Sequence, residues 1–273
     1  MKIVKMALII VFVLSFGIFG VSEVLALGSR DMSDPVITSD RDVLEIPCEY
    51  TQEQLMEGIT ASDAEDGDLT DQIVAGSFSR FISDGVCSLT YVVFDSANRT
   101  ASLTRDVRFT DYHPPRFTLT EPLVFREQEG SYTEAMDRLG AQDMLDGDLD
   151  DWITQTATDV NYSRAGNYTM SVEVSNSFGD TSTADLPVHV VSAENQQTQI
   201  GLTAGIVYLQ QGASVDPSDY IESVTDSSGN SIDVSGVSAD SNVDPDTPGC
   251  YEIHYETDGG ETWLTVIVEG GGA

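Results

Sequence analysis

The sequence predicts an all-β protein built from small two-sheet domains in tandem, chiefly because the chain repeats itself. An acidic turn motif, ASDAEDGDLT, occupies residues 61–70 and returns as AQDMLDGDLD at residues 141–150. Each copy is followed, further along, by a glycine and a run of alternating apolar and polar residues. A third run of this kind begins at Pro248. Repetition at this interval indicates three small domains and favours a function carried by the array over one carried by a single catalytic cleft.

Residues 1–26 are typical of a signal peptide. Lys2 and Lys5 precede an apolar run at residues 6–21, and the triplet at 24–26 fits the small-x-small rule for cleavage. The alternative is an uncleaved anchor, which would be the chain's only contact with a membrane. Because the apolar run is shorter than the roughly 20 residues that cross a bilayer comfortably, cleavage is favoured. The sequence therefore predicts a secreted or extracellular cell-surface protein.

The first predicted domain covers residues 34–111 and ends in an antiparallel hairpin. Two alternating runs flank the polar turn at residues 95–98, which is the pattern of two paired strands. Because successive side chains of a strand point to opposite faces, one set of apolar residues should face the core. That set is Leu89, Tyr91, Val93, Leu103, Val107 and Phe109. A single helical turn is expected within residues 51–56.

The second and third predicted domains cover residues 115–191 and 200–269 and repeat the hairpin. By the same alternation, their inward-facing residues are Met170, Val172, Val174, Leu186, Val188 and Val190 in the second, and Ile253, Tyr255, Leu264, Val266 and Val268 in the third. Residues 132–139 are expected to form a helical turn. Prolines should stiffen the joint at 111–115, whereas the Asn/Gln-rich joint at 192–199 should be looser.

The net charge of −34 narrows the classes of partner. Both lysines lie in the leader, so arginine is the only strongly basic residue of the exported part. Such a surface repels nucleic acid and anionic membranes, and it attracts cations. A high-salt habitat, where self-repulsion is screened, and simple solubility explain the charge equally well.

Three cysteines in an exported chain allow one disulfide and one thiol left over. Cys48 is in phase with Leu44, and Cys87 is in phase with Leu89, so both are expected in the core of the first domain. A Cys48–Cys87 bridge would close a loop of about 40 residues and contribute roughly 2 to 4 kcal/mol. Two buried reduced thiols are the alternative. Cys250 is out of phase with Cys87 and should face solvent.

Three motifs occur in a fixed order in the first domain: DPVIT at 34–38, TASDAEDGDLT at 60–70 and GVCSLTYVVFDSAN at 85–98. Together they resemble the bacterial immunoglobulin-like domain of surface proteins, a module also found attached to some insecticidal crystal toxins. The resemblance extends over nearly the whole exported chain and is weakest in the third domain, where DSSGN at 226–230 replaces the acidic turn. It implies immunoglobulin-like β-sandwiches used as spacers or adhesive modules, without an active site. Nothing in the chain resembles the toxic domains.

The acidic turns are candidate calcium sites, because hard cations prefer a shell of oxygen ligands. The candidate ligands are Asp63, Glu65, Asp66 and Asp68 in the first domain, and Asp143, Asp146 and Asp148 in the second together with Asp111 of the preceding joint. The resemblance implies that these turns lie at the same end as the last hairpin turn and the entering chain, where an ion would stiffen the joint. The alternative is turn chemistry, in which glycine supplies a positive φ and aspartates accept backbone hydrogen bonds.

Catalysis is not expected, and no cofactor other than calcium is predicted. His113 lies in a joint, and His189 and His254 occupy outward strand positions, so none adjoins a nucleophile and an orienting acid. Trp152 and Trp263 raise the alternative of a sugar-binding surface. The sequence therefore predicts a non-catalytic stalk or adhesion module whose partner would be a cell-surface protein or a glycan. A carbohydrate-binding accessory protein is the alternative.

Overall fold

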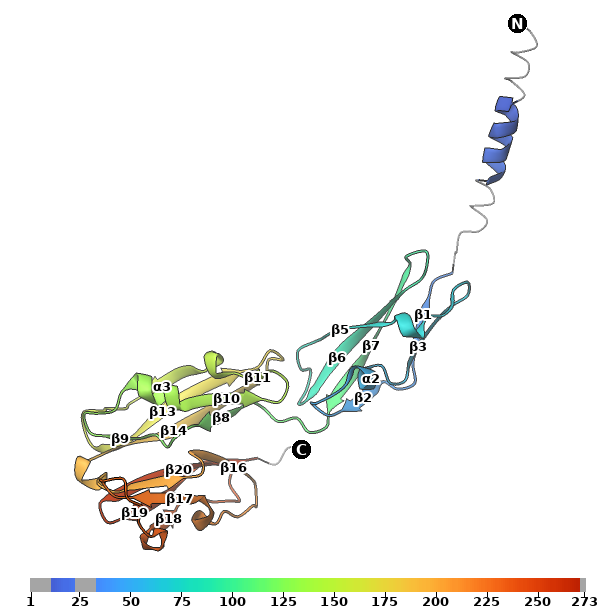
Figure 1. Ribbon diagram of the computed structural model, residues 1–273. Helices are drawn as coiled ribbons and strands as arrows, with labels where there is room; N and C mark the ends of the chain where they lie inside the picture. The colour runs from blue at the N-terminus through green and yellow to red at the C-terminus, as the bar shows by residue number, and fades with distance from the viewer. Residues whose placement is uncertain (1–10, 23–32, 271–273) are drawn as a thin grey trace. The chain divides into compact units, whose positions relative to one another are not determined.

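The computed structural model describes residues 11–22 and 33–270 and confirms the all-β class (Figure 1). Residues 11–22 form a helix. In the described ranges, no helix has both the length and the apolar character that a membrane crossing requires. The predicted cleavage triplet at 24–26 lies outside the described residues.

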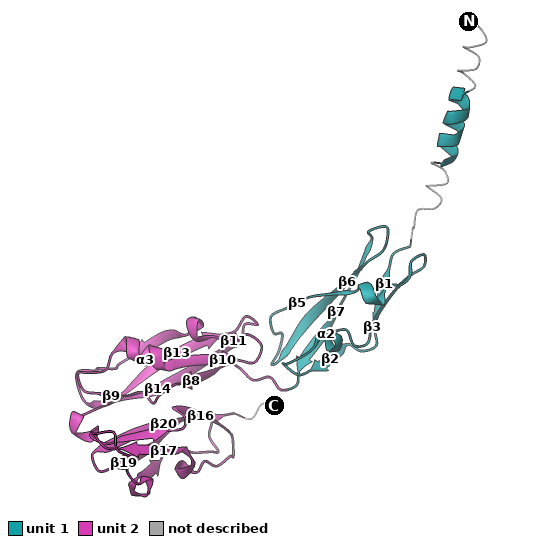
Figure 2. Ribbon diagram, in the orientation of Figure 1, with its two compact units in different colours: residues 1–110 teal, residues 111–273 magenta. Residues whose placement is uncertain are grey.

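The chain divides into two compact units, residues 1–110 and residues 111–273 (Figure 2). In the first unit the smaller sheet has the strand order β1-β3-β4 and the larger sheet has the order β2-β7-β6-β5. The strands are β1 (Val36–Ser39), β2 (Val43–Ile46), β3 (Ile59–Asp63), β4 (Gly67–Asp68), β5 (Val74–Phe78), β6 (Val86–Phe94) and β7 (Thr100–Phe109). The short helical elements between them are α2 (Gln52–Leu55) and η1 (Thr70–Gln72).

The core of the first unit lies between its two sheets and confirms the alternation expected of the hairpin. Leu89, Tyr91, Val93 and Val107 are fully buried, Phe109 is nearly so, and Leu103 is half-buried. The helical turn predicted within residues 51–56 is α2. It is fixed by a capping box in which the Thr51 hydroxyl accepts from the Gln54 N–H and the Gln54 side chain accepts from the Thr51 N–H.

The second unit begins with a sandwich of the same design. Its smaller sheet has the order β11-β10-β8 and its larger sheet has the order β12-β13-β14-β9. The strands are β8 (Arg116–Leu119), β9 (Val124–Arg126), β10 (Leu139–Asp143), β11 (Gly147–Asp148), β12 (Thr154–Thr158), β13 (Gly166–Ser175) and β14 (Thr181–Val191). The predicted helical turn is α3 (Tyr132–Arg138), and η2 (Asp150–Trp152) follows the acidic turn. Every predicted inward residue of β13 and β14 is at most 2% exposed.

The remainder of the second unit pairs a two-stranded sheet, β15-β17, with a four-stranded sheet, β16-β20-β19-β18. The strands are β15 (Gln199–Leu202), β16 (Ile206–Gln210), β17 (Ile221–Thr225), β18 (Ser238–Ser241), β19 (Gly249–Thr257) and β20 (Gly260–Glu269). The 3₁₀ turns are η3 (Ala193–Asn195), η4 (Pro217–Tyr220) and η5 (Val234–Gly236). All five predicted inward residues of β19 and β20 are buried.

The three larger sheets share one strand pattern, which extends the sequence repeat to the topology. In each, an early strand runs parallel to the second strand of the final hairpin. The pairs are β2 with β7, β9 with β14, and β16 with β20. The same pattern in the third sheet shows that the fold persists there without the acidic turn.

Residues 115–191, called here the second segment, and residues 200–269, called the third segment, belong to one compact unit. Ile206 of the third segment is buried in the same apolar cluster as Phe117 and Leu119 of the second. The joint between the segments, residues 192–199, is also hydrogen-bonded to both of them. The Gln196 side chain donates to the Glu261 carbonyl, and the Gln196 carbonyl accepts from Arg126. The expectation of a loose joint at 192–199 is therefore wrong, since its amide side chains bind the neighbouring strands.

Candidate functional site

The acidic turn of the first unit is organised around Asp63 at the end of β3. Its Oδ1 accepts hydrogen bonds from the N–H groups of Glu65 and Asp66 at 2.8 and 3.1 Å. Ser33 donates its hydroxyl to both oxygens of the same carboxylate. These donors, led by the Glu65 N–H, lower the pKa of the Asp63 carboxyl, because they stabilise its ionised form. Gly67 completes the turn with a φ of 78°.

Each acidic turn also braces the last hairpin turn of its sandwich. Asp66 Oδ2 accepts from the Ser96 N–H at 2.7 Å. In the second segment Asp146 accepts from both the N–H and the hydroxyl of Ser177, at 2.6 and 2.8 Å. The acidic turn and the final hairpin turn therefore lie at the same end of the sandwich.

In the second segment, the entering chain joins this cluster through Tyr112. Asp143 Oδ1 accepts from the N–H groups of Leu145 and Asp146, and its Oδ2 accepts from the Asn176 side chain at 3.1 Å. Asn176 also donates to the Tyr112 hydroxyl, which donates to Asp180 at 2.8 Å. Burial, and then the neighbouring Asp180, raise the pKa of Tyr112, so the phenol remains a donor.

The predicted calcium ligands are thus brought to the expected places, but most of the aspartates are engaged by backbone donors. Asp68 and Asp148 accept from the N–H groups of Thr70 and Asp150, while Glu65 and Asp111 are exposed. Within residues 11–22 and 33–270, no three acidic, histidine or cysteine side chains come together as a metal site would require. The geometry is that of turn chemistry, and calcium binding stays a prediction.

A guanidinium already lies at the acidic end of the first unit. Arg99 Nε is 3.1 Å from Asp95 Oδ2, and Arg99 Nη1 is 3.6 Å from Asp34 Oδ1. In the second segment, Asn176 stands where the first unit has Asp95, and Asp180 stands where it has Arg99, so the arginine has no counterpart there. The chain therefore supplies its own cation beside the first turn.

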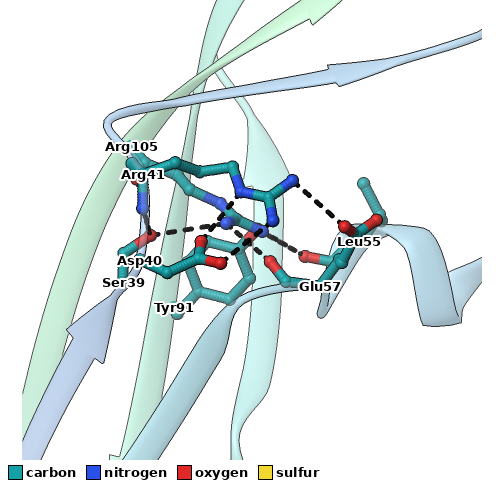
Figure 3. Close-up of polar contacts among 7 residues, drawn as sticks. All are labelled: Ser39, Asp40, Arg41, Leu55, Glu57, Tyr91 and Arg105. Atoms are coloured by element: carbon teal, nitrogen blue, oxygen red, sulfur yellow. Dashed lines mark hydrogen bonds and ion pairs between the residues drawn. The ribbon is translucent and has the colours of Figure 1, made fainter.

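The first unit contains a buried arginine that the sequence analysis did not single out (Figure 3). Arg105 is 3% exposed. Its Nε donates to the Tyr91 hydroxyl, and its two Nη atoms donate to the carbonyls of Glu57 and Leu55 at 2.8 and 2.9 Å. The Tyr91 hydroxyl donates to the same Leu55 carbonyl. Because these carbonyls end the α2 turn, the network attaches that turn to the large sheet and has a structural role.

The signal for Arg105 was present in the strand pattern. It lies two residues after Leu103 and two before Val107, so alternation points it into the core. Charged residues are rarely buried without partners, which is why the pattern alone did not suggest it. Only the fold brings the carbonyls of the α2 turn to the guanidinium.

Cys48 and Cys87 are both buried, as expected, and Cys250 is exposed. Burial raises the pKa of the Cys87 thiol to about 11. No disulfide joins Cys48 to Cys87 among the described residues, so that bridge stays a prediction. In the large sheet Cys87 pairs with Val107 on one side of β7, whereas Leu44 of β2 pairs with Val107 on the other. The strand β7 therefore separates Cys87 from β2, the strand that leads to Cys48.

The second and third segments meet through polar and aromatic contacts as well as apolar ones. Arg116 forms a bidentate pair with Glu269, at 2.8 and 2.5 Å. Its guanidinium carbon also lies 5.1 Å from the centre of the Tyr208 ring. The Tyr208 hydroxyl accepts from the Phe117 N–H at 2.7 Å. These contacts tie β8 to β16 and β20.

Both outward-pointing histidines take part in this junction. His189 is only 4% exposed and stacks on Trp263 with ring centres 3.9 Å apart and planes 8° apart. His254 stacks on the opposite face of Trp263 at 4.3 Å. The His189 Nε2 contacts Glu252, and the His254 Nε2 lies 3.2 Å from Glu261. Both histidines occupy the outward strand positions that the alternation predicts. His189 is nevertheless buried, because the third segment covers the outer face of the second segment's large sheet.

A cleft of about 800 Å³ opens in the second unit beside this junction. Its charged lining residues are Glu121, Arg126, Glu129, Glu134, Arg138, Glu222 and Glu261. Both arginines are engaged, Arg126 by the Gln196 carbonyl and Arg138 by the Pro122 carbonyl and Glu134. The cleft therefore offers no uncommitted guanidinium to an anionic ligand.

None of these groups has the arrangement of a nucleophilic catalyst. The hydrogen-bond partners of the histidines are the Pro114 carbonyl for His113, Asn167 and Glu252 for His189, and Glu261 for His254. Each of these partners is a backbone carbonyl, a side-chain amide or a carboxylate, and none is the hydroxyl or thiol of a nucleophile. Trp263 lies between two histidines, whereas Trp152 is 69% exposed.

Comparison with known proteins gives a distant sequence relative. No family model matches the chain. The chain is 29% identical over 203 residues to the pesticidal crystal protein Cry22Aa of Bacillus thuringiensis, a match that covers 72% of this chain and 27% of that protein. The chain thus spans about a quarter of the length of this curated relative.

Solved structures resemble the chain weakly. One contains the CBM51-2 and INT domains of Clostridium perfringens ZmpB in complex with GlcNAc, with a TM-score of 0.24, 18% identity, and coverage of 56% of this chain and 26% of that chain. The S-layer protein rSbsC has a TM-score of 0.24, 13% identity, and coverage of 88% and 41%. The protocadherin gammaB7 EC3-6 structure has a TM-score of 0.21, 10% identity, and coverage of 87% and 77%. Similarity at this level supports no conclusion about function.

Proposed function

We propose that this chain is an exported, non-catalytic array of three β-sandwich domains, at residues 34–111, 115–191 and 200–269, acting as an extracellular stalk or adhesion module. The observation that carries the proposal is how the polar residues are used. The turn carboxylates, the buried Arg105 and the stacked His189 and His254 hold loops and junctions together. Side chains committed to internal contacts suit a spacer or a rigid binding surface, rather than a catalyst.

The distant relative supports a shared module and no more. The match to the pesticidal crystal protein covers 27% of that protein. A protein of that length has room for other domains, so its activity does not transfer to this chain.

The test of the proposal uses the exported chain, purified and fluorescently labelled. An adhesion module should bind a cell or extracellular-matrix surface saturably, and a pure spacer should bind none. Neither should turn over a panel of glycan, peptide and ester substrates. Turnover that a single substitution such as Asp143→Asn or His189→Gln abolishes, while the melting temperature stays unchanged, would overturn the non-catalytic assignment.

Carbohydrate binding is the second candidate, and one residue favours it. Trp152 is 69% exposed on η2, next to the acidic turn. An exposed indole face is the kind of surface on which a sugar ring can stack. On a glycan array, the Trp152→Ala variant should lose any signal of the parent chain, whereas Phe94→Ala, which removes another exposed aromatic ring, should retain it. No glycan signal from the parent chain would reject this candidate.

A further inference from the structure

The cleft of the second unit is bordered by the edges of two sheets. Its lining includes every residue of β9 and every residue of β15. The strand β9 is the last strand of its sheet, and β15 is the first strand of its own. Because neighbouring side chains of a strand point to opposite faces, an unbroken run of lining residues means that the edge of the strand borders the cleft.

The edge of β9 is already bonded from within the chain. The Val124 carbonyl accepts from Arg138 at 3.2 Å, and the Arg126 carbonyl accepts from the N–H groups of Glu129 and Gly130. Another strand could pair with β9 only by breaking these bonds. The edge of β9 is therefore closed to a ligand.

The edge of β15 is open at Ile200. Opposite Ile200 lies Val224 of β17, whose carbonyl points to the far side of β17 and accepts from the Ile232 N–H at 2.8 Å. In an antiparallel ladder, two directly opposed residues either bond to each other or both point their backbone groups away. The N–H and C=O of Ile200 consequently point away from β17, to the edge that borders the cleft.

The chain itself shows how this edge is used. Two residues before Ile200, Thr198 donates its N–H from the same edge to the Gly259 carbonyl at 2.8 Å. Beyond that bond, no group in the described part of the chain pairs with the Ile200 N–H or C=O. Unpaired backbone groups on a strand edge are a template for a further strand.

A polar side chain at the same cleft also lacks a partner. Thr262 of β20 lines the cleft and is 6% exposed. Among residues 11–22 and 33–270, its hydroxyl has no hydrogen-bond partner. The cleft therefore offers a ligand a backbone edge and a hydroxyl, from two different strands.

The charge of the cleft favours a basic ligand. Five glutamates and two arginines line it, and both arginines are held by internal contacts. Glu222 of β17 is exposed and has no ion-pair partner within the described ranges. An excess of carboxylates attracts cationic groups. A second copy of this chain, with a net charge of −34, would be repelled.

We propose that the cleft binds an extended peptide segment of a partner protein, rich in lysine and arginine, which adds as a strand to the edge of β15. The peptide backbone bonds to the N–H and C=O of Ile200, and its basic side chains approach the glutamates. Main-chain bonds supply affinity in this mode, and the side chains supply selectivity. The volume of about 800 Å³ is within the range usual for ligand-binding clefts.

This inference rests on the proposed adhesive role, because it names the class of partner. The first test titrates the exported chain by calorimetry with a synthetic peptide of alternating lysine and threonine. It should bind, and binding should weaken as salt is added. The same peptide with N-methylated amides keeps its charge but loses its backbone donors, so it should bind about tenfold more weakly. Equal binding of the two peptides, or no binding of either, would overturn the proposal.

Substitutions and hydrogen exchange locate the peptide. Glu222→Gln should weaken binding about two- to fivefold, which is the contribution of one exposed ion pair. Glu256→Gln removes an exposed carboxylate of the third segment outside the cleft and should have no effect. Exchange of the Ile200 amide hydrogen should slow when the peptide binds. Binding without protection of that amide would place the peptide elsewhere and reject the proposal.

The cell-binding assay separates this proposal from the adhesive role on which it rests. A chain with Glu222→Gln and Thr262→Val is compared with the parent chain. Reduced binding to cells would support both proposals. Unchanged, saturable binding would keep the adhesive role and reject the cleft as its site. Peptide binding by a parent chain that binds no cell surface would reject the adhesive role and support the cleft alone.

Discussion

Arg105 illustrates how a charged residue can belong to a sandwich core. Its guanidinium is buried but donates to Tyr91 and to two backbone carbonyls. Removing such a partner leaves buried acceptors without donors, which costs more than a surface ion pair contributes. The burial of Arg105 is therefore compatible with stability only while the α2 turn remains in place.

We expect Arg105→Met to destabilise the first unit by about 3 kcal/mol, because the Glu57 carbonyl loses its side-chain donor and the Leu55 carbonyl keeps only the Tyr91 hydroxyl. The matched control is Arg41→Met, which removes an exposed arginine paired with Asp40 and should have a much smaller effect. Calorimetry of the full chain measures both. Equal losses in the two variants would contradict the structural role of Arg105.

Asp63 makes the stability of the first unit sensitive to acid. Its pKa is lowered in the folded state, so its contribution is present above the unfolded value, about 3.9, and is lost as pH falls through the folded value. Melting temperatures measured from pH 7 downward should therefore fall in acid. Asp63→Asn should lower the melting temperature at pH 7 and reduce the further decline, whereas Glu49→Gln, at an exposed position, should do neither.

Calcium binding at the turns is tested by the same measurement in the presence of the ion. If Asp143 and Asp146 ligate calcium, adding it should raise the melting temperature of the second unit, and Asp146→Asn should remove the rise. Magnesium, which demands near-octahedral geometry, should substitute poorly. No change between calcium and a chelator would reject the ion and leave the hydrogen-bonded turn as the full account.

At the scale of elements, glycines allow the chain to reverse between short strands. Gly147 has a φ of 76°, and a Cβ there would meet no described atom within 4 Å. Gly58 has a φ of 73°, and a Cβ there would lie 2.0 Å from Asp40 Oδ1. Both glycines have a left-handed backbone conformation, but only at Gly58 would an added Cβ also collide with a neighbouring side chain.

We therefore expect Gly147→Ala to cost about 1 to 2 kcal/mol, which is the price of a left-handed conformation alone. Gly58→Ala should cost more, because Asp40 must also leave its contact with Arg41. Urea unfolding of each variant gives the comparison. A smaller loss of stability for Gly58→Ala than for Gly147→Ala would contradict this expectation, because it would mean that the Asp40 side chain moves away at little cost.

At the scale of the whole molecule, the two units differ in how their parts depend on one another. The second unit has an apolar cluster that includes residues of both segments, together with the Arg116–Glu269 pair. Shared burial of this kind makes two sandwiches unfold together. The first unit, residues 1–110, has its own core.

Calorimetry should accordingly resolve the first unit from the second and show the second as one transition. Tyr208→Ala removes the acceptor of the Phe117 N–H and part of the shared packing, so it should split that transition in two. Tyr132→Ala, an exposed position on α3, should leave the transition single. Two transitions in the parent second unit would contradict the coupling.

The sequence by itself determined the all-β class, the repeat and the inward faces of the three hairpins, because alternation and turn composition are local properties of the chain. The resemblance, and no local pattern, implied that the acidic turns lie at the same end as the last hairpin turns, and the structure places them there. The sequence did not reveal that the outer face of β20 is covered, although Trp263 and Ile267 on that face were a signal of it. The tertiary structure decided the burial of His189, the donors of each carboxylate and the firmness of the joint at 192–199. These depend on which groups far apart in the chain meet, and no local pattern encodes that.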